Sequence, residues 1–239
     1  TLGKGRLRVA EFGAGGGHTL VHLAAEHECT ALDLSSSMLA HCARLVPEVT
    51  CIMGDMRDAD LRDTFDAILI HDAVDYLLTE ADLLATLHNA RQHLRDDGVL
   101  IVTPTYTEET FVEHDAATDH RDDLSVTLFS YVHDPDPRDT TFELILVYLI
   151  RRPRVGGSVK IEQDRHRCGL FPMRGAGGWL KLLREAGFKV ETRLPAANDE
   201  AAGVAGPGVM VVARKAALPR PKRGAGVRGT GKAKRGRRP

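Results

Sequence analysis

The chain has 239 residues, which is enough for one α/β domain with a single core. Its 43% hydrophobic and 27% charged residues are ordinary for a soluble globular protein. No apolar run is long enough to span a membrane, and the residues from Thr1 to Arg8 lack the apolar core of a signal peptide. We therefore expect a cytoplasmic protein without a membrane partner.

The formal charge of −1 conceals an uneven distribution. From Arg214 onward there are 11 Lys or Arg and no Asp or Glu, so 21 basic and 33 acidic residues remain in 1–213, a charge of about −12. An acidic body repels the phosphate backbone of a nucleic acid. Residues 216–239 have too little apolar content to fold, so we interpret them as a disordered basic tail after a domain over 1–215.

Strand and helix patterns alternate in the first part of the chain. Short apolar strand patterns occupy Arg6–Phe12, Cys29–Leu34, Thr50–Met53, Phe65–His71 and Val99–Thr103. Helical spacing of apolar residues occupies Thr19–Glu26, Ser35–Leu45 and Glu80–Leu94, with Ser35 or Ser36 as the N-cap of the second helix and a turn at Asp96–Gly98. This alternation predicts βαβ units and a parallel sheet.

The rhythm changes in the second half of the chain. β-rich alternating patterns without helices between them occupy Leu124–His133, Thr140–Arg151 and Ser158–His166, and they predict an antiparallel insertion over about 120–170. A helix at Ala176–Ala186, ended by Gly187, and strands at Lys189–Arg193 and Val209–Arg214 would then complete the main sheet, with a loop over Pro195–Gly208. We expect a Rossmann-like α/β fold with a mostly parallel, seven-stranded sheet.

The strongest motif is Glu11-Phe-Gly13-Ala-Gly15-Gly-Gly17, at the end of the first strand. Glycines at alternate positions let the backbone turn sharply and approach a ligand closely. The dinucleotide fingerprint G-x-G-x-x-G is not met, because His18 stands at its last position. An acid ahead of the glycines suits the ammonium of a methionine-like group better than a pyrophosphate.

Two further acidic positions follow strands at the same predicted sheet edge. Asp33 ends the second strand, where a carboxylate would accept hydrogen bonds from ribose hydroxyls. Gly54–Asp58 (GDMRD) follows the third strand, where Asp55 can accept from an adenine amino group and Met56 can pack on its ring. Taken alone, each of these positions also fits a structural role, in a helix cap or a polar turn.

Across Arg6–Thr103 this pattern resembles the class I methyltransferases that use S-adenosylmethionine (SAM). GDMRD, Glu109–Phe111 (ETF) and Arg165–Phe171 (RHRCGLF) are similar to the amino-sugar N,N-dimethyltransferases, and the glycine N-methyltransferase-like group is more distant. The resemblance implies a SAM site formed by Glu11, Gly13, Gly15, Gly17, Asp33, Asp55 and Met56. Related enzymes carry a covering segment ahead of the first strand, so either this chain is truncated or its insertion supplies the cover.

The stretch His71-Asp72-Ala73-Val74-Asp75-Tyr76 follows the fourth strand, where the family places residues that flank the transferred methyl group. The resemblance implies that His71 lies beside the cofactor and that Asp72 or Tyr76 faces the acceptor. An amine acceptor must lose a proton, so we take His71, Asp72, Asp75 and His166 as candidate bases. Tyr106 and Trp179 are candidates for the acceptor pocket, with core packing the stronger interpretation for Trp179.

We therefore predict transfer of a methyl group to a nitrogen or oxygen of a small-molecule acceptor such as an amino sugar. A nucleic-acid or protein acceptor guided by the basic tail, and a SAM-binding protein without catalysis, are the alternatives. The four cysteines have no CxxC spacing, and the His18/His22 and His114/Asp115/His120 groups match no zinc motif, so we expect reduced thiols and no metal. We allow for a homodimer.

Overall fold

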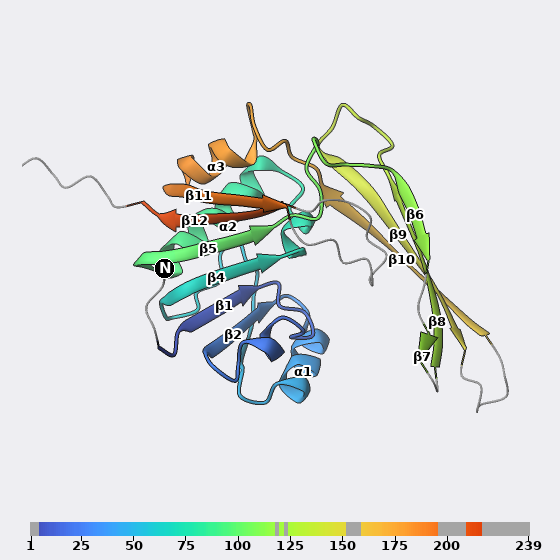
Figure 1. Cartoon of the computed structure of the whole chain (residues 1–239), viewed down its shortest axis with the longest axis horizontal. Coiled ribbons are helices and arrows are strands. Elements are labelled where there is room, and N and C mark those ends of the chain that lie inside the picture. Colours follow the sequence, from blue (N-terminus) through green and yellow to red (C-terminus); the bar gives the residue numbers. More distant parts are fainter. Residues whose placement is uncertain (1–4, 118–119, 122–123, 152–158, 196–208, 217–239) are drawn as a thin grey trace, which may run out of the picture.

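A computed structural model describes residues 5–117, 120–121, 124–151, 159–195 and 209–216 (Figure 1). The predicted tail, apart from Ala216, and most of the predicted loop over Pro195–Gly208 lie outside these residues.

The main sheet has seven strands in the order β11-β12-β5-β4-β1-β2-β3. These strands are β1 (Arg8–Phe12), β2 (Glu28–Asp33), β3 (Thr50–Met53), β4 (Phe65–His71), β5 (Leu94–Thr103), β11 (Phe188–Pro195) and β12 (Val209–Lys215). Strands β1 to β5 pair in parallel, whereas β12 is antiparallel to both of its neighbours. The predicted Rossmann-like α/β fold is confirmed.

Helices cover both faces of this sheet. They are α1 (Ser36–Leu45), α2 (Glu80–His93) and α3 (Trp179–Glu185), with short 3-10 helices η1 (Leu20–His22) and η2 (Ala73–Tyr76). Ser35 is the N-cap of α1, because its hydroxyl accepts from the Met38 N–H. Alternate residues of β4 pack into two different cores, Ile68 and Ile70 on the α2–α3 side and Ala67 on the α1 side. A strand covered on both faces reads as a continuous apolar run, as β4 does.

The insertion forms a second, antiparallel sheet beside the main one, to the right in Figure 1. It runs in the order β10-β9-β8-β6, with β7 also on β8, and its strands are β6 (His114–Ala117), β7 (His120–Arg121), β8 (Leu124–His133), β9 (Thr141–Arg151) and β10 (Val159–Gly169). A buried cluster anchors it to the segment that follows β5, and this cluster consists of Tyr106, Val132, Phe142, Cys168 and Leu170. The predicted insertion is present and begins earlier than expected.

Two local predictions are wrong. The segment Thr19–Glu26 was predicted as a helix, but it contains only the short 3-10 helix η1. Its backbone hydrogen bonds connect residues three apart, as from the Leu23 N–H to the Leu20 carbonyl, and four apart, as from the His27 N–H to the Leu23 carbonyl. So short a segment forms too few hydrogen bonds to offset the free-energy cost of nucleating an α-helix. The turn expected at Asp96–Gly98 lies inside β5, because Leu94 pairs with Phe65 and Val99 with Ala67, leaving a bulge between them.

The glycine turn after β1 packs directly on α1. Gly17 has a φ of +82°, and a Cβ placed on it would lie 2.6 Å from the Cys42 sulfur. Cys42 is fully buried in the core beneath α1. A side chain at Gly17 would therefore need both a disfavoured backbone conformation and a shift of the helix.

We predict that Gly17→Ala destabilises the fold more than Gly175→Ala. Gly175 also has a positive φ, +95°, but no atom lies within 4 Å of a Cβ built there. Backbone strain alone costs about 1–2 kcal/mol, and overpacking adds roughly 1–3 kcal/mol at Gly17. Urea denaturation followed by circular dichroism measures both, and equal losses in the two variants would contradict this packing.

Candidate active site

Side chains from several strands meet at the carboxyl edge of the main sheet. Glu11 on β1 pairs with Ala31 of β2 and Leu69 of β4. Asp33 lies two residues after Ala31 on β2, and His71 lies two residues after Leu69 on β4. Because side chains alternate between the two faces of a sheet, Glu11, Asp33 and His71 all point to the face that α1 covers. The negative charges of Asp33 and Asp72 both act on Glu11. The fold therefore brings these predicted site residues together.

Glu11 is the most constrained of these groups. Its side chain is only 3% exposed, and its Oε2 has no hydrogen-bond partner in the described part of the chain. Burial raises the pKa of Glu11 to about 7, the Thr19 side chain lowers it by hydrogen bonding, and the charges of Asp72 and Asp33 raise it. A buried carboxyl with a free oxygen suits a cationic donor from a ligand.

The glycine turn lies against this carboxyl edge. A Cβ on Gly13 would lie 2.1 Å from that of Ala73, so only glycine lets the turn approach η2 so closely. Asp33 holds the turn in place, because its Oδ2 accepts from the Gly15 N–H at 2.7 Å and its Oδ1 from the Ser35 N–H at 2.8 Å. Each carboxylate oxygen can accept a second hydrogen bond, so Asp33 can still accept from ribose hydroxyls.

In the GDMRD segment, Asp55 forms an ion pair and Met56 reaches the glycine turn. The carboxylate of Asp55 is bound by the Arg57 guanidinium, with Oδ2 2.7 Å from Nη2, and Arg57 also contacts Asp82 at 2.6 Å. Hydrogen bonding from Arg57 lowers the pKa of Asp55. Met56 reaches the glycine turn, since its Cε lies 3.4 Å from a Cβ built on Gly13. The Met56 side chain also packs against the core on the α2–α3 side of the sheet.

The segment after β4 connects this edge to the inserted sheet. His71 Nε2 lies 3.7 Å from Asp72 Oδ1, and both side chains are more than half exposed. Asp72 has a φ of +53°, a strained conformation for a non-glycine residue. Further along η2, the Tyr76 hydroxyl lies 3.2 Å from His166 Nδ1 on β10. Three of the four candidate bases therefore lie in two side-chain pairs, His71 with Asp72 and His166 with Tyr76.

Three other predicted residues have structural environments. Asp75 is buried and accepts hydrogen bonds from the backbone and side chain of Thr105, while burial raises its pKa to about 8. Tyr106 packs edge-on against Phe111 and Phe142 at the base of the insertion, so it is core rather than pocket lining. Trp179 is 2% exposed in the core beneath α3, as the core interpretation predicted.

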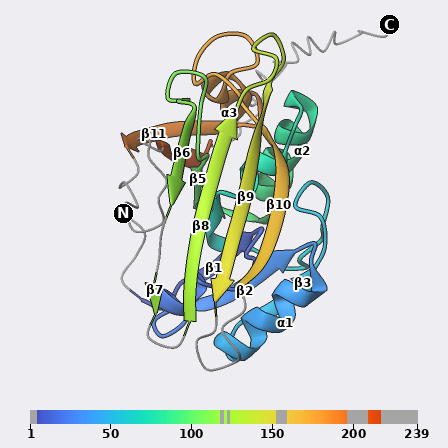
Figure 2. The same cartoon turned by 90° about the vertical axis from the view of Figure 1, so that its right-hand side faces the viewer.

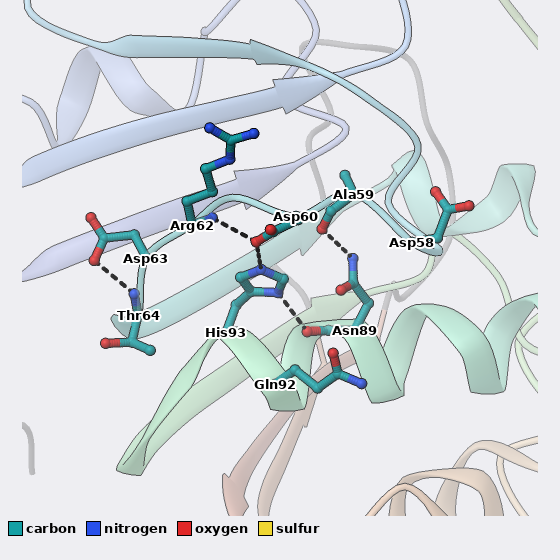
Figure 3. Close-up of a pocket in the computed structure, with 9 residues that line it drawn as sticks. All are labelled: Asp58, Ala59, Asp60, Arg62, Asp63, Thr64, Asn89, Gln92 and His93. Atoms are coloured by element: carbon teal, nitrogen blue, oxygen red, sulfur yellow. Dashed lines mark hydrogen bonds and ion pairs between the residues drawn. The ribbon is translucent and has the colours of Figure 1, made fainter.

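A surface depression of about 580 Å³ lies at the opposite end of the sheet, between the β3–β4 segment and the end of α2 (Figure 3). None of the predicted site residues lines it. His93 within it donates from Nδ1 to the Asn89 carbonyl at 3.0 Å and accepts from the Leu61 N–H at 3.1 Å. These bonds join α2 to the β3–β4 segment, so His93 has a structural role.

Two polar groups of the site were not identified in the sequence. The Thr19 side chain hydrogen-bonds Glu11. Thr103 at the end of β5 pairs with His71, and its buried Oγ1 has no partner within the described ranges. Both threonines lie outside any motif, and only the strand register and the fold of the turn bring them to the site. In the same ranges no group of three metal-ligating side chains occurs, and no helix is long and apolar enough to span a membrane.

This arrangement fits SAM in three respects. The Oε2 of Glu11, which has no partner among the described residues, suits the ammonium of the methionine part, and the positive-φ glycine turn follows directly after it. Asp33 retains acceptor capacity for a ribose, and Met56 offers an apolar surface beside the turn.

Comparison with known proteins gives the same result. A methyltransferase domain family matches residues 9–98. The chain is 34% identical over 125 residues to a dTDP-3-amino-3,4,6-trideoxy-alpha-D-glucopyranose N,N-dimethyltransferase of Streptomyces venezuelae, covering 51% of this chain and 53% of that relative. The chain thus matches about half the length of that relative.

Two solved structures share the fold over most of the chain. Streptomyces venezuelae DesVI has a TM-score of 0.75 and 27% identity, covering 88% of this chain and 84% of DesVI. SAM-bound CalS10, an amino pentose methyltransferase from Micromonospora echinaspora, has a TM-score of 0.74, 22% identity and the same two coverages, 88% and 84%. Residues 9–98 therefore match a methyltransferase domain family, and the chain shares its fold over most of its length with these two solved structures.

Proposed function

We propose that the chain transfers a methyl group from SAM to the amine nitrogen of a small-molecule amino sugar. This proposal rests mainly on the buried Oε2 of Glu11, which has no hydrogen-bond partner among the described residues and lies beside the glycine turn. From the same sheet edge, η2 leads to its last residue, Tyr76, which contacts His166. The similar protein of Streptomyces venezuelae is an amino-sugar N,N-dimethyltransferase, which supports an amine acceptor. Transfer to an oxygen is the alternative within this reaction class.

The cofactor site in this proposal uses the residues at the carboxyl edge. Glu11 pairs with the ammonium, the backbone of Gly13, Gly15 and Gly17 cradles the methionine part, and Asp33 accepts from the ribose. Met56 and Asp55 flank the adenine, and His71 lies beside the reacting group. When bound, SAM supplies a methyl group on a sulfonium sulfur, which is transferred by in-line displacement.

The inserted sheet would hold the acceptor against this edge. A neutral amine attacks the methyl carbon, and the new N-methylammonium then releases one proton to a base. His166 can accept that proton directly, or through the Tyr76 hydroxyl 3.2 Å from its Nδ1. Asp72 and His71 form the second candidate pair, 3.7 Å apart, nearer the cofactor edge. Holding the amine nitrogen in line with the bond between the methyl carbon and the sulfur accounts for much of the rate acceleration.

The remaining parts of the proposal concern partners and location. We infer a small-molecule acceptor, no membrane partner and no nucleic-acid partner, since residues 1–213 carry about −12 charges, from 21 basic and 33 acidic residues. We also infer that the protein is cytoplasmic and forms a homodimer. A nucleic-acid or protein acceptor, and SAM binding without turnover, are the competing functions.

We predict that SAM and its demethylated product raise the melting temperature, and that Asp33→Ala removes most of this shift. The variant loses the ribose acceptor and the bond that holds the Gly15 N–H. Loss of charge-assisted hydrogen bonds of about 1.5–3 kcal/mol weakens binding roughly 10- to 100-fold. Asp96→Ala, at a fully exposed carboxylate at the opposite end of β5, is the control. No shift of the folded wild type with either ligand would contradict the cofactor site.

We predict that SAM binding weakens as the pH falls below about 7. Burial raises the pKa of Glu11 to about 7, so below that pH the carboxyl must lose a proton to pair with an ammonium. One proton corresponds to at most a tenfold change in affinity per pH unit. Calorimetric titration between pH 5.5 and 8.5 should show this slope in the wild type, and a flat profile in Glu11→Gln would assign it.

The same group should affect the ligand-free protein in the opposite direction. Its folded pKa is raised above the unfolded value, so the folded state binds the proton more tightly and is stabilised as the pH falls towards 4.5, the ordinary value. Glu11→Gln should remove this contribution. Stability that rises with pH in the wild type relative to Glu11→Gln would contradict the assignment.

We predict that His166→Ala lowers kcat towards a nucleotide-linked amino sugar by about 100-fold or more, as expected for loss of a general base. Tyr76→Phe should have a smaller effect, because it removes only the hydroxyl. Gln163→Ala, on the opposite face of β10, is the matched control. Turnover that is unchanged in His166→Ala would assign the proton to Asp72 or His71 instead.

Two further measurements separate the competing functions. Salt-dependent binding of RNA or DNA that vanishes on deletion of 216–239 would favour a nucleic-acid acceptor. SAM binding without turnover across amines and hydroxyls would favour a binding protein.

A further inference from the structure

Arg57 joins the segment after β3 to helix α2. Its guanidinium forms a fork with Asp55, in which Nε lies 3.0 Å from Oδ1 and Nη2 lies 2.7 Å from Oδ2. Its remaining nitrogen, Nη1, lies 2.6 Å from Oδ1 of Asp82, in the first turn of α2. One arginine therefore binds two carboxylates that belong to different elements of the fold.

Helix α2 holds both sides of this contact. The hydroxyl of Thr79, the N-cap of α2, donates to Oδ2 of Asp82 at 2.6 Å and accepts from its N–H at 3.1 Å. Two turns later, Asn89 donates from Nδ2 to the carbonyls of Met56 at 3.0 Å and Ala59 at 3.1 Å. In Figure 2 this helix and the end of β3 lie on the same side of the molecule. Because α2 packs in the main core, it is a firm support for the segment after β3.

Folding stability is a poor explanation for this network. The side chains of Arg57, Asp55 and Asp82 are 46%, 24% and 28% exposed, and ion pairs at such positions contribute little to the free energy of unfolding. A fork of the same kind joins Arg138 to Asp136 on the insertion, but there the arginine binds no second carboxylate within the described ranges. The bridge to α2 therefore distinguishes Arg57 and calls for a functional explanation.

The fork limits how Asp55 can bind anything else. A carboxylate has about four positions that accept a hydrogen bond. Arg57 occupies three of them, with its backbone N–H at 2.9 Å from Oδ1, its Nη2 at 2.7 Å from Oδ2, and its Nε shared between the two oxygens at 3.0 and 3.1 Å. One acceptor position of Asp55 remains, and the planar fork fixes its direction.

The neighbours of Asp55 place it at the carboxyl edge of the sheet. The N–H of Gly54, just before it, donates to the carbonyl of Asp33 at 3.0 Å. Met56, just after it, reaches within 3.4 Å of a Cβ built on Gly13. The 6-amino group of an adenine at this edge needs one acceptor in a fixed direction. A site built around such a hydrogen bond discriminates strongly against an analogue that lacks the donor.

We propose that Arg57 is a positioning residue, held in place by Asp82, which directs the remaining acceptor of Asp55 at the 6-amino group of adenine. The first turn of α2 then determines how strictly the protein distinguishes adenine from other purines. The inference rests on the cofactor site of the proposed function and adds a specificity that depends on α2. It is independent of the methyl acceptor and of the base.

Calorimetric titration of the full chain with two ligands tests this role. The ligands are S-adenosylhomocysteine, the demethylated product of SAM, and its purine analogue, in which a hydrogen atom replaces the 6-amino group. The wild type should bind the first ligand about 10- to 100-fold more tightly than the second. Arg57→Gln should lower this ratio to about threefold or less, with the affinity for the analogue unchanged within about twofold. A general loss of structure would weaken both ligands alike.

Three further variants separate orientation from charge and from support. Arg138→Gln removes the matching fork on the insertion and should leave the ratio unchanged. Arg57→Lys keeps the charge without the fork, so it should behave like Arg57→Gln. Asp82→Asn keeps the fork but weakens its support, so it should lower the ratio by a smaller factor than Arg57→Gln.

The outcomes distinguish this inference from the proposed function. If Arg57→Gln keeps the wild-type ratio, or if Arg57→Lys restores it in full, the positioning role is wrong and the cofactor site stands. Equal binding of the two ligands by the wild type would also overturn the inference, because adenine would then not be recognised through its amino group. A folded wild type that binds neither ligand contradicts the proposed function itself, and the inference falls with it. If Arg57→Gln binds neither ligand, Asp82→Asn decides, and an unchanged ratio in that variant overturns the inference.

Discussion

The structure depends on one buried carboxyl at the end of the first strand. Glu11 lies between β2 and β4, is 3% exposed and leaves one oxygen without a partner within the described residues. An unsatisfied buried carboxylate is costly, so a folded domain that keeps one calls for a functional explanation. Burial raises the pKa of Glu11 to about 7, and this shift reflects the cost of burying its negative charge.

The surroundings of Glu11 follow from this constraint. The chain turns immediately after β1, and three glycines with positive φ make the turn. Asp33 holds the turn by accepting the Gly15 N–H, which places a second acid beside the first. The negative charge of Asp33 raises the pKa of Glu11. The pair of acids suits a ligand with a positive charge near Glu11 and hydroxyl groups near Asp33.

The inserted sheet joins the main sheet through the segment after β5 and through η2. Phe142, Val132 and Cys168 form a buried cluster with Tyr106 at its base. Strand β10 brings His166 to Tyr76. The insertion therefore places titratable groups from distant parts of the sequence side by side.

The sequence by itself determined the order of the elements in the main sheet and the edge at which the predicted site residues meet. Strong local signals did this: the ends of β3 and β4 were predicted to the residue, and Ser35, one of the two serines predicted as the cap, bonds its own helix. The glycine turn and Asp33 follow directly from strand ends in a parallel sheet. The single turn of η1 and the bulge in β5 were missed, because local propensity there yields to strand pairing.

Only the tertiary structure decided which titratable groups meet. Tyr76 and His166 are 90 residues apart and are joined by the docking of the insertion on η2. Asp55 is held by Arg57, which also reaches Asp82 on α2, and Tyr106 lies in a core rather than a pocket. Such contacts depend on how distant elements pack, and residue type and spacing carry no information on that packing until the backbone has folded.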